Sequence, residues 1–565
     1  MDNNLIALAD LLFPEEAPNQ IDASDSSLFW PTEMYEAGYP PRNLRSGAMV
    51  TRLGPSPTGF VHLGNLFMAL VNKKLAEQSG GVFLLRIEDT DQKREVEGAV
   101  PALLQSLAYF GISFDEGAGL AAEHGKYGPY YQSARRAIYR AHVRKLVLEG
   151  KAYPCFLAPE QLEAIRKKQS EAKELPGVYG DYAKWRSADI ALVRELIDAG
   201  EPYVIRLNAD SIDAPDEGKT FTITDGIRGN ITMPKNIVDV VILKTDGLPT
   251  YHFAHVVDDH LMRTTHVVRG EEWLSSLPIH IALFRALGFE PPVYCHTALM
   301  MKLDNGVKRK LSKREDPEFA LSYYIADGYH PLAVQEYLLT VINSNFEEWR
   351  MSTPDIDSSA FVLTTEKMGA SGILFDLDKL QNISRDTLSR IPASELADFV
   401  LDWVKREKPD AFQLLSDNKA VLSAALDIGR SGDKPRKDLI YAAQIFGFVS
   451  YFFDPYFHME EPLPDNITEE DAYTLLKGYL ASYEHSDGRE QWFDKIRSLS
   501  AENGYAPKPK DYKNNPDLYK GHVGDVSTVI RRALTGRRNS PDIYEIQQIL
   551  GEQRVRARLG PGKRE

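Results

Sequence analysis

The segment between Ala48 and Leu75 constrains the fold more than any other part of the chain. It starts with the apolar run AMV, continues through the Gly- and Pro-rich sequence TRLGPSPTGFVHLGN, and ends with apolar residues at helical spacing. An apolar run followed by Gly and Pro, and then by a helical pattern, predicts a buried strand that turns sharply into a helix. We therefore expect a strand–turn–helix unit of an α/β protein here.

A turn of this kind is a candidate phosphate site. Backbone N–H groups at a helix N-terminus have no partner within the helix and carry partial positive charge, so they attract anions. Pro55 stiffens the turn, whereas Gly54, Gly59 and Gly64 permit backbone geometry and close ligand approach that a β-carbon would block. His62, at the start of the expected helix, is placed to donate a hydrogen bond to a phosphoryl oxygen. Taken alone, the turn is equally compatible with an ordinary strand-to-helix connection.

Length and composition limit the class of protein. A chain of 565 residues is too long for a single core and suggests roughly three to five domains. It is 43% hydrophobic and 26% charged, as is usual for a soluble globular protein, and no apolar run approaches the roughly twenty residues that a membrane span needs. Residues 1–45 are rich in Asp and Glu and nearly free of Lys and Arg, which is the reverse of a signal or transit peptide. We therefore expect a cytoplasmic protein.

Net charge argues against indiscriminate nucleic-acid binding. The formal charge is −15, whereas nonspecific affinity for nucleic acid comes mainly from neutralising phosphates. Basic residues are nevertheless concentrated in residues 308–314 and in the Arg-rich end of the chain, from Arg531 to Arg564. An acidic body with basic faces suits a protein that must hold one structured RNA and release it.

The order of strand and helix patterns predicts the domain organisation. Patterns alternate over residues 48–132, which predicts the first half of a doubly wound parallel sheet of the Rossmann-like type. Residues 133–238 have a mixed α/β pattern and predict an inserted domain. Residues 239–299 are expected to return to the sheet, with one buried strand at VDVVILK and another at HVVRGEEW. Helical patterns then follow almost to the terminus and predict an all-α C-terminal half.

Two short signatures connect this organisation with a known family. HLG at His62–Gly64 resembles the HIGH signature of class I aminoacyl-tRNA synthetases, and KLSKR at Lys310–Arg314 resembles their KMSKS loop. Together with TRLGPSPTG, LRIEDTD and LPTYHFAHVVDDHLM, they make the chain resemble glutamyl-tRNA synthetases of the bacterial and organellar type. The resemblance covers most of the chain, from Met49 to about Leu559.

The resemblance implies ligation of L-glutamate to tRNA(Glu), with ATP and Mg²⁺, through a glutamyl-adenylate. It assigns residues 133–238 to the acceptor end of tRNA, residues 300–385 to a stem-contact domain with the KLSKR loop, and residues 386–565 to a helical anticodon-binding region. Residues 1–47 lie outside the resemblance and are expected to be a partly disordered or docking extension of acidic character. We expect a monomer whose partners are tRNA(Glu), L-glutamate and ATP, with no membrane and no DNA.

Such a ligation needs no covalent bond to the protein, so positioning and charge stabilisation must supply the acceleration. The turn and the following helix would hold ATP, while an exposed lysine-rich loop would close over the triphosphate as diphosphate leaves. The residues expected to bind ATP are Pro55, Ser56, Gly59, His62, Gly64, Asn65, Lys310 and Lys313. Of these, His62, Lys310 and Lys313 are expected to be catalytic.

Glutamate carries two carboxylates and one ammonium group, and Arg is suited to grip a carboxylate with two parallel hydrogen bonds. The resemblance places Arg52 and Arg269 in the amino-acid pocket, with Ser56 and Tyr251 adding hydrogen bonds and Glu88 accepting from the α-ammonium group. Without the flanking signatures, either arginine is more simply explained as part of a surface or interdomain ion pair.

A basic turn near the C-terminus is a candidate RNA contact. Arg537 and Arg538 are followed by Asn539, Ser540 and Pro541, and donors of this kind suit unstacked bases and phosphates. By composition alone, the turn is equally a basic helix terminus that supports the fold. The resemblance favours contact with the anticodon through Arg537, Arg538 and Ser540.

No resident metal is expected. Cys155 and Cys295 are too few for a four-ligand zinc site, and some family members carry a cysteine-rich zinc site where this chain has only Cys155. Asp258 and Asp259 are more simply explained as strand-end or helix-cap carboxylates than as a metal pair. Mg²⁺ is therefore expected to arrive with ATP.

Several alternatives share part of this pattern. A non-discriminating enzyme would also charge tRNA(Gln), whereas glutaminyl-tRNA synthetases usually have β-barrel anticodon domains and glutamyl-queuosine enzymes lack the second half. A synthetase-like RNA-binding protein should have decayed signatures, but His62, Gly64, Lys310 and Lys313 are intact. The role of His255, where some relatives have Asn, is left open.

Overall fold

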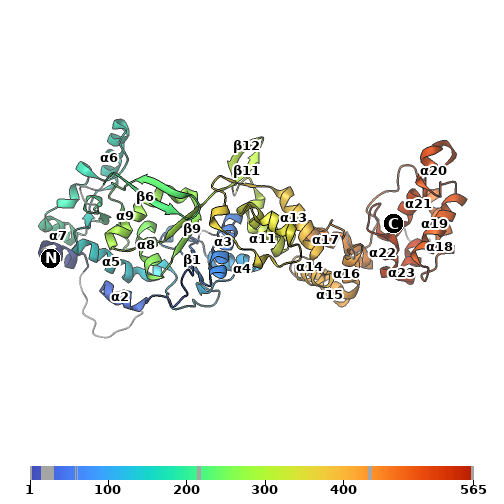
Figure 1. The fold of residues 1–565 in the computed structure, drawn as a ribbon, viewed down its shortest axis with the longest axis horizontal. Helices are drawn as coiled ribbons and strands as arrows, with labels where there is room; N and C mark the ends of the chain where they lie inside the picture. Colours follow the sequence, from blue (N-terminus) through green and yellow to red (C-terminus); the bar gives the residue numbers. More distant parts are fainter. Residues whose placement is uncertain are drawn as a thin grey trace. The chain divides into compact units, whose positions relative to one another are not determined.

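The computed structural model describes residues 3–13, 31–57, 59, 61–212, 218–312, 314–430 and 435–560. The chain forms two compact units. Unit 1 consists of Met1–Tyr323 and Leu338–Asp376, and unit 2 consists of Tyr324–Tyr337 and Leu377–Glu565. Figure 1 shows sheets covered by helices in unit 1 and helices alone in the C-terminal part of unit 2. No helix of the described ranges is both long and apolar enough to cross a membrane.

Unit 1 is organised around parallel strands, as predicted. They are β1 (Val50–Leu53), β2 (Val82–Leu85), β3 (Glu116–Gly117), β9 (His266–Gly270) and β10 (Val293–Thr297). β2 pairs in parallel with both β1 and β3, and β9 pairs in parallel with β10. The two groups meet at β1 and β9, where the backbone N–H of Thr265 donates to the carbonyl of Val50 at 2.9 Å. The predicted Rossmann-like fold class is confirmed.

The predicted strand–turn–helix unit is formed by β1 and α3 (Leu63–Ser79). All four residues of β1 are buried, and α3 buries an apolar face that includes Leu66, Phe67 and Leu70. α3 ends at Gly80, whose φ of 66° allows the left-handed backbone that terminates the helix. The chain then returns at once to the sheet, because the backbone N–H of Val82 donates to the carbonyl of Met49.

Further helices cover these strands and lead through the rest of unit 1. They are α4 (Ala99–Tyr109), α5 (Arg136–Leu148), α6 (Pro159–Ala172), α7 (Ile190–Asp198), α8 (Tyr251–Leu261), α9 (Leu277–Leu287) and α12 (Phe346–Ser352). α10 (Leu321–Asp327) and α11 (Pro331–Ile342) include residues of both units. α9 connects β9 to β10, as α3 connects β1 to β2, and this repeated crossover is typical of a doubly wound sheet.

The insertion contains an antiparallel sheet of its own. β4 (Ala152–Cys155), β5 (Val204–Leu207) and β8 (Val241–Leu243) form it, and β6 (Thr220–Asp225) pairs with β7 (Gly229–Pro234) in a separate hairpin. The expectation that VDVVILK returns to the parallel sheet was therefore wrong. β8 is buried and apolar, which sequence alone cannot distinguish from a central parallel strand.

A second hairpin carries the KLSKR signature. β11 (Met300–Asp304) pairs antiparallel with β12 (Val307–Lys310) and in parallel with β13 (Ile373–Phe375). Asn305 and Gly306 form the turn between the first two strands, both with positive φ. The register places Lys310 opposite Met301.

Part of the N-terminal extension is docked on unit 1. α1 (Asn3–Leu12) packs against α5 and α7, and α2 (Thr32–Gly38) also packs against α5. Asp10 accepts a hydrogen bond from Arg144 at 2.6 Å, and Glu36 accepts one from Arg263 at 2.8 Å. The docking alternative therefore holds for these helices, while residues 14–30 lie outside the described residues.

Unit 2 is helical and has one extended apolar core. The core includes buried residues from Leu388 to Leu559. Its helices are α13 (Leu377–Arg390), α14 (Ala393–Glu407), α15 (Pro409–Asp417), α16 (Lys419–Asp427), α17 (Ala442–Val449), α18 (Glu469–Ser482), α19 (Arg489–Glu502), α20 (Pro509–Asn514), α21 (Val523–Thr535), α22 (Ile543–Leu550) and α23 (Glu552–Leu559). The predicted all-α character of the C-terminal half is confirmed.

The packing of Gly81 against β1 generates a stability prediction. A β-carbon on Gly81 would overlap the backbone of Met49, which cannot move without disturbing the β1–β2 pairing. We expect Gly81→Ala to lower the free energy of unfolding of unit 1 by about 1–3 kcal/mol, as for other overpacked sites. Urea unfolding followed by circular dichroism measures this change. Gly38→Ala is the control, because no atom lies within 4 Å of its added β-carbon; an equal loss in both variants would contradict the explanation.

Candidate functional site

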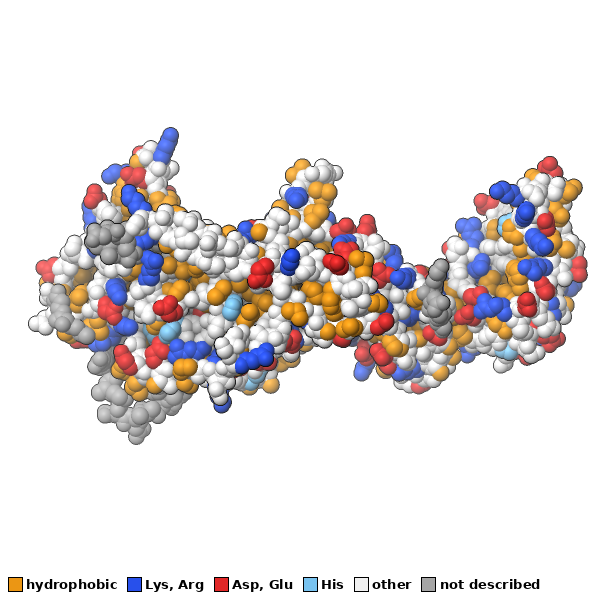
Figure 2. Space-filling view, viewed as in Figure 1, with side chains coloured by type: hydrophobic (Ala, Val, Ile, Leu, Met, Phe, Trp, Pro, Cys, Tyr) orange, Lys and Arg blue, Asp and Glu red, His pale blue; other side chains and the backbone are white. Residues whose placement is uncertain are grey.

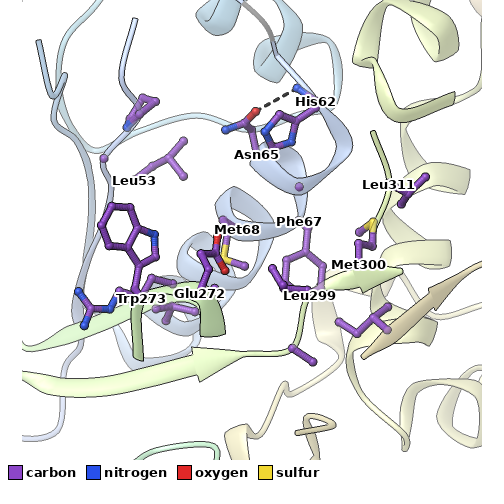
Figure 3. A pocket seen from close by; sticks show the side chains of 18 of the residues that line it. Leu53, His62, Asn65, Phe67, Met68, Glu272, Trp273, Leu299, Met300 and Leu311 are labelled. Atoms are coloured by element: carbon purple, nitrogen blue, oxygen red, sulfur yellow. Dashed lines mark hydrogen bonds between the residues drawn. The ribbon is translucent and has the colours of Figure 1, made fainter. Parts of the chain in front are cut away.

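The parallel strands, the turn and the β11–β12 hairpin enclose a cavity of about 410 Å³ in unit 1. This volume is in the range usual for small-ligand sites. Figure 3 shows His62 and Asn65 at the start of α3, Glu272 and Trp273 after β9, and Met300 and Leu311 on the hairpin side. The predicted site residues that line the cavity are Arg52, Pro55, His62, Gly64, Asn65, Glu88, Tyr251, Arg269 and Lys310.

The N-terminus of α3 faces this cavity. His62 precedes the helix, and its backbone N–H donates to Oδ1 of Asn65 at 3.0 Å, as the dashed line in Figure 3 indicates. A β-carbon on Gly64 would lie 2.9 Å from Nδ1 of His62, so the glycine leaves room for the imidazole ring. The N–H groups of the first helical turn that have no partner within α3 can donate to an anion in the cavity.

The segment that follows KLSKR lies beside the turn. The ring of Phe319 stacks on His62 with centroids 4.5 Å apart, and the backbone N–H of Leu321 donates to the carbonyl of Val61 at 3.2 Å. Lys310 is exposed and lines the cavity. The structure thus brings His62 and Lys310 to one cavity, whereas Lys313 lies outside the described residues and its role stays a prediction.

Asp316 anchors the same segment. Its carboxylate accepts hydrogen bonds from both Nη atoms of Arg309, at 2.6 and 2.8 Å, and from the backbone N–H of Ser312 at 2.8 Å. Nζ of Lys302 adds a hydrogen bond at 3.1 Å. These hydrogen bonds, led by that of Arg309, hold the pKa of Asp316 well below its usual range.

At the end of β1, Arg52 and Glu88 approach each other across the cavity wall. Arg52 is 4% exposed, and its Nε lies 3.4 Å from Oδ2 of Asp259. Glu88 accepts a hydrogen bond from Nη2 of Arg86 at 3.1 Å, and burial raises the pKa of its carboxyl. A β-carbon on Gly54 would overlap the Glu88 carboxylate, which explains why the turn needs glycine at that position.

Asp258 and Asp259 lie within α8 rather than at its cap, so the helix-cap expectation was wrong. Both are fully buried on α8. Asp258 accepts hydrogen bonds from Nε of Arg135 at 2.6 Å and from the hydroxyl of Tyr139 at 2.7 Å, and Asp259 accepts one from Nη1 of Arg86 at 2.6 Å. The sequence shows these two aspartates but not that they are buried, because the partners of a buried ion pair leave no periodic signal in a sequence.

Charge pairing sets the protonation of this group. Burial alone would raise the pKa of Asp259, but the charges of Arg86 and Arg52 outweigh it and hold that pKa well below its usual range. Burial lowers the pKa of His255 to about 3, so its imidazole is neutral while it lies 3.0 Å from Asp259. His255 does not line the cavity and instead contacts the hydroxyl of Tyr294 at 3.0 Å.

Tyr251 and Arg269 form the opposite wall. The ring of Tyr251 lies 4.5 Å from that of Trp273, and burial raises the pKa of its hydroxyl to about 12. Arg269 is 5% exposed and donates from Nε to His296 and from Nη1 to His280, each at 3.0 Å. Its Nη2 is buried without a hydrogen-bond partner among the described residues, so it remains available to a ligand.

Two predicted residues do not reach this cavity. Ser56 and Gly59 are exposed and line a separate, much smaller cavity of about 20 Å³ beside α4. Several further residues line the main cavity and were not predicted as site residues from the sequence: Met68, Glu272, Trp273, Met300, Leu311 and Phe319. The one sequence signal for Glu272 and Trp273 was that the expected strand HVVRGEEW ends in charged residues.

The predicted tRNA-binding residues lie in unit 2. Arg537 donates to both carboxylate oxygens of Glu460, at 2.6 and 2.8 Å, so its charge is paired. The backbone N–H of Arg538 donates to Glu461 at 2.5 Å, and the hydroxyl of Ser540 donates to the carbonyl of Pro541 at 2.9 Å. Figure 2 shows Lys and Arg side chains, with acidic ones between them, over the region of α19–α21.

Within the described ranges, no three or more His, Cys, Asp or Glu residues are arranged to hold a metal ion. Cys155 and Cys295 are both free and buried. Cys155 packs beside Nε of Arg206 at 3.3 Å, and burial raises the pKa of the Cys295 thiol.

Comparison with known families agrees with this geometry. The family model described as tRNA synthetases class I (E and Q), catalytic domain, matches residues 48–379, and the model described as anticodon binding domain matches residues 520–562. The first match covers more than half of the chain and contains every residue that lines the cavity. The chain therefore belongs to the class I tRNA synthetases of the E and Q type.

Curated relatives narrow the family further. A glutamate–tRNA ligase from Acetivibrio thermocellus is 55% identical, with 98% of each chain covered, and one from Clostridium perfringens is 46% identical, covering 98% of this chain and 99% of its own. A solved glutamate tRNA ligase from Elizabethkingia meningosepticum, in complex with its amino acid, has a TM-score of 0.69 and 25% identity. It covers 90% of this chain and 98% of its own. Within the class, the family is that of the glutamate–tRNA ligases.

The role of Asp259 generates a prediction on stability and pH. Asp259→Asn removes the counter-charge that Arg86 and Arg52 share and leaves Arg86 only with Glu88 and the more distant Asp258. We expect the free energy of unfolding at pH 7 to fall by about 3–5 kcal/mol. The pKa of Asp259 is lowered in the folded state, so its stabilisation is complete above the unfolded value of about 4. The difference between wild type and variant should therefore be constant from pH 7 to about 5 and shrink below about 4.

Urea unfolding of both proteins at several pH values measures this difference. Glu163→Gln is the control, because it removes an exposed carboxylate of α6 that is paired only with Arg166 at 3.8 Å. That variant should change stability by less than about 0.5 kcal/mol. A difference that grows as the pH falls would contradict the charge assignment.

Proposed function

We propose that the protein ligates L-glutamate to tRNA(Glu) in two steps, through a glutamyl-adenylate, with release of AMP and diphosphate. One observation carries the proposal: the His62 turn, Lys310 and two buried arginines all line one cavity in a chain of this family. Relatives named glutamate–tRNA ligase that match across nearly the full length support the choice of glutamate.

ATP would bind at the α3 end of the cavity. The first-turn N–H groups and the glycine-bearing turn suit phosphate oxygens, and Mg²⁺ would enter with the nucleotide. The carboxylate of glutamate then attacks the α-phosphorus, and the bond to diphosphate breaks. Lys310 would stabilise the charge on the departing diphosphate, with His62 donating to a phosphoryl oxygen. Lys313 is proposed to act with Lys310.

Glutamate would occupy the wall formed by β1, α8 and β9. Arg269 offers its free Nη2 to one carboxylate, while Arg52 and the hydroxyl of Tyr251 offer further donors. Glu88 would accept a hydrogen bond from the α-ammonium group of glutamate. Burial raises the pKa of Glu88, and the positive charge of the ammonium group would favour the ionised form of the Glu88 carboxylate. Glutamine would bind less well, because an amide cannot replace a charge-assisted hydrogen bond to a buried guanidinium.

The tRNA would be held by the remaining parts of the chain. We propose that the insertion, residues 133–238, handles the acceptor end, that residues 300–385 contact the stem, and that residues 386–565 bind the anticodon. The helical character of unit 2 supports a glutamyl rather than a glutaminyl enzyme. Arg538 is the strongest candidate for an RNA contact in the basic turn, because its Nε lies 3.9 Å from Glu461, whereas Arg537 is bound to Glu460 at 2.6 and 2.8 Å. A monomer that works in the cytoplasm completes the proposal.

Incubation with glutamate, ATP, Mg²⁺ and bulk tRNA tests the function directly. We expect diphosphate release and acid-precipitable glutamyl-tRNA, with glutamine giving neither at the same concentration. Purified tRNA(Glu) and tRNA(Gln) then distinguish a discriminating enzyme from a non-discriminating one. Absence of charging on every tRNA tested would refute the proposal.

The pocket assignment makes a prediction for Arg269. Arg269→Ala should raise the KM for glutamate by about 100-fold, because it removes charge-assisted hydrogen bonds from a buried site, and should change the KM for ATP by less than about twofold. Aminoacylation kinetics at saturating tRNA measure both constants. Arg285→Ala is the control, since Arg285 is exposed on α9. Equal changes in the two constants would count against the assignment.

A second prediction concerns Lys310. Lys310→Ala should lower kcat by about 100-fold or more, because its charge is needed mainly as diphosphate departs. The KM for glutamate should change little. Lys308→Ala is a matched control on the same strand, because Lys308 does not line the cavity. A similar loss of kcat in the control would show that general positive charge, rather than Lys310, is responsible.

A further inference from the structure

The guanidinium of Arg269 is held by neutral histidines rather than by carboxylates. Its Nε donates to Nε2 of His296 and its Nη1 donates to Nδ1 of His280, each at 3.0 Å. An arginine can only donate, so both imidazole nitrogens must be acceptors and carry no proton. This leaves Nη2 as the part of the guanidinium without a partner among the described residues.

The acceptor role of His296 fixes the proton on its other nitrogen. Nδ1 of His296 therefore donates to Oδ2 of Asp225, at 2.6 Å, and both side chains are buried. Oδ1 of Asp225 accepts from the backbone N–H groups of Ile227 and Arg228, at 2.9 and 3.0 Å. Both oxygens of the Asp225 carboxylate thus accept hydrogen bonds. By holding the proton on Nδ1 of His296, the carboxylate leaves Nε2 as the acceptor for Arg269.

His280 behaves in the same way on the other side. Because Nδ1 accepts from Arg269, Nε2 carries the proton and donates to Nδ1 of His252 at 3.0 Å. Burial lowers the pKa of both His280 and His296, which keeps the rings neutral near pH 7. Neutral acceptors orient the guanidinium without cancelling its charge, whereas a directly paired carboxylate would compete with a ligand carboxylate.

Asp225 belongs to the insertion rather than to the parallel sheet. It ends β6, and hydrogen bonds fix the β6–β7 turn to β10. Gly226 N–H donates to the carbonyl of Tyr294 at 2.8 Å, and Arg228 Nε donates to that of His296 at 2.9 Å. Asp225 binds the His296 ring and also accepts from the backbone N–H of His296 at 3.1 Å. Arg228 also pairs with Glu271, two residues after Arg269, at 2.6 Å. The β6–β7 hairpin therefore contacts the residues that hold Arg269 without lining the cavity itself.

We propose that Asp225 and His296 are positioning residues for glutamate, through which the β6–β7 hairpin of the insertion orients the Arg269 guanidinium toward the substrate carboxylate. The inference rests on the proposed function and adds a specificity element outside the cavity, since neither residue lines it. It also connects the insertion physically with the amino-acid pocket.

Asp225→Asn is the decisive variant. Oδ1 of the asparagine can keep the turn, but its amide would donate to Nδ1 of His296 and move the ring proton to Nε2. The N–H at Nε2 of His296 would then face the Nε–H of Arg269, so the nitrogen that must accept from Arg269 becomes a donor. We expect the KM for glutamate to rise by about 10- to 100-fold and the KM for ATP to change less than about twofold.

Two substitutions of His296 separate positioning from general packing. In His296→Gln, the side-chain carbonyl can occupy the place of Nε2 and accept from Arg269. In His296→Asn, the shorter amide can reach Asp225 but leaves Nε of Arg269 without an acceptor. We expect a larger rise in the KM for glutamate with Asn than with Gln, and unchanged KM for ATP in both. The reverse order, or equal effects on the two substrates, would overturn the proposal.

Thr222→Val is the matched control on the same hairpin. Thr222 is exposed, and among the described residues its hydroxyl pairs across the hairpin with Thr232, at 2.8 Å, so its replacement should leave both KM values unchanged. Wild-type aminoacylation in the same assay reports on the proposed function. If the wild type charges tRNA with glutamate while Asp225→Asn leaves the KM for glutamate unaltered, this inference alone fails. If the wild type charges no tRNA, the proposed function fails and this inference with it.

Discussion

The buried charge cluster on α8 is the constraint on which the site depends. Asp258 and Asp259 bind Arg135 and Arg86 at 2.6 Å each, and Asp259 also holds Arg52 at a longer distance. Removing such charges from water is costly, and the attraction compensates only if the geometry is maintained. The cluster therefore fixes α8 against the end of β1, where the cavity begins. Tyr251, at the other end of α8, is placed by the same arrangement.

The two arginines proposed for glutamate are held by different means. Arg52 shares Asp259 with Arg86, so part of its charge is already balanced inside the protein. Arg269 is oriented by uncharged imidazoles, and the carboxylate of Asp225 acts on it through His296. Among the described residues, Arg269 therefore has no hydrogen-bonded carboxylate, whereas Arg52 has Asp259. The side-chain carboxylate of glutamate would supply a negative charge that its amide lacks, which gives a physical reason for preferring glutamate to its amide.

Much of the fold could be predicted because it depends on local signals. The turn after β1 and the crossover helix α3 follow from proline, glycine and apolar spacing. β8 was assigned to the wrong sheet, because a buried apolar strand looks the same in either. The Asp258–Arg135 and Asp225–His296 contacts could not be predicted at all. They join residues 123 and 71 positions apart, and no local pattern encodes such pairing.

The setting of Lys310 limits what has to move during the reaction. Lys310 ends a strand that pairs with β11, and β11 pairs in turn with β13, so its backbone is part of a three-stranded sheet. Only the exposed side chain is left to search for phosphate. Rotamer changes of exposed side chains take picoseconds to nanoseconds, whereas typical enzymes complete about 1–1,000 cycles per second. Side-chain motion of this lysine alone is therefore far too fast to set the pace of turnover.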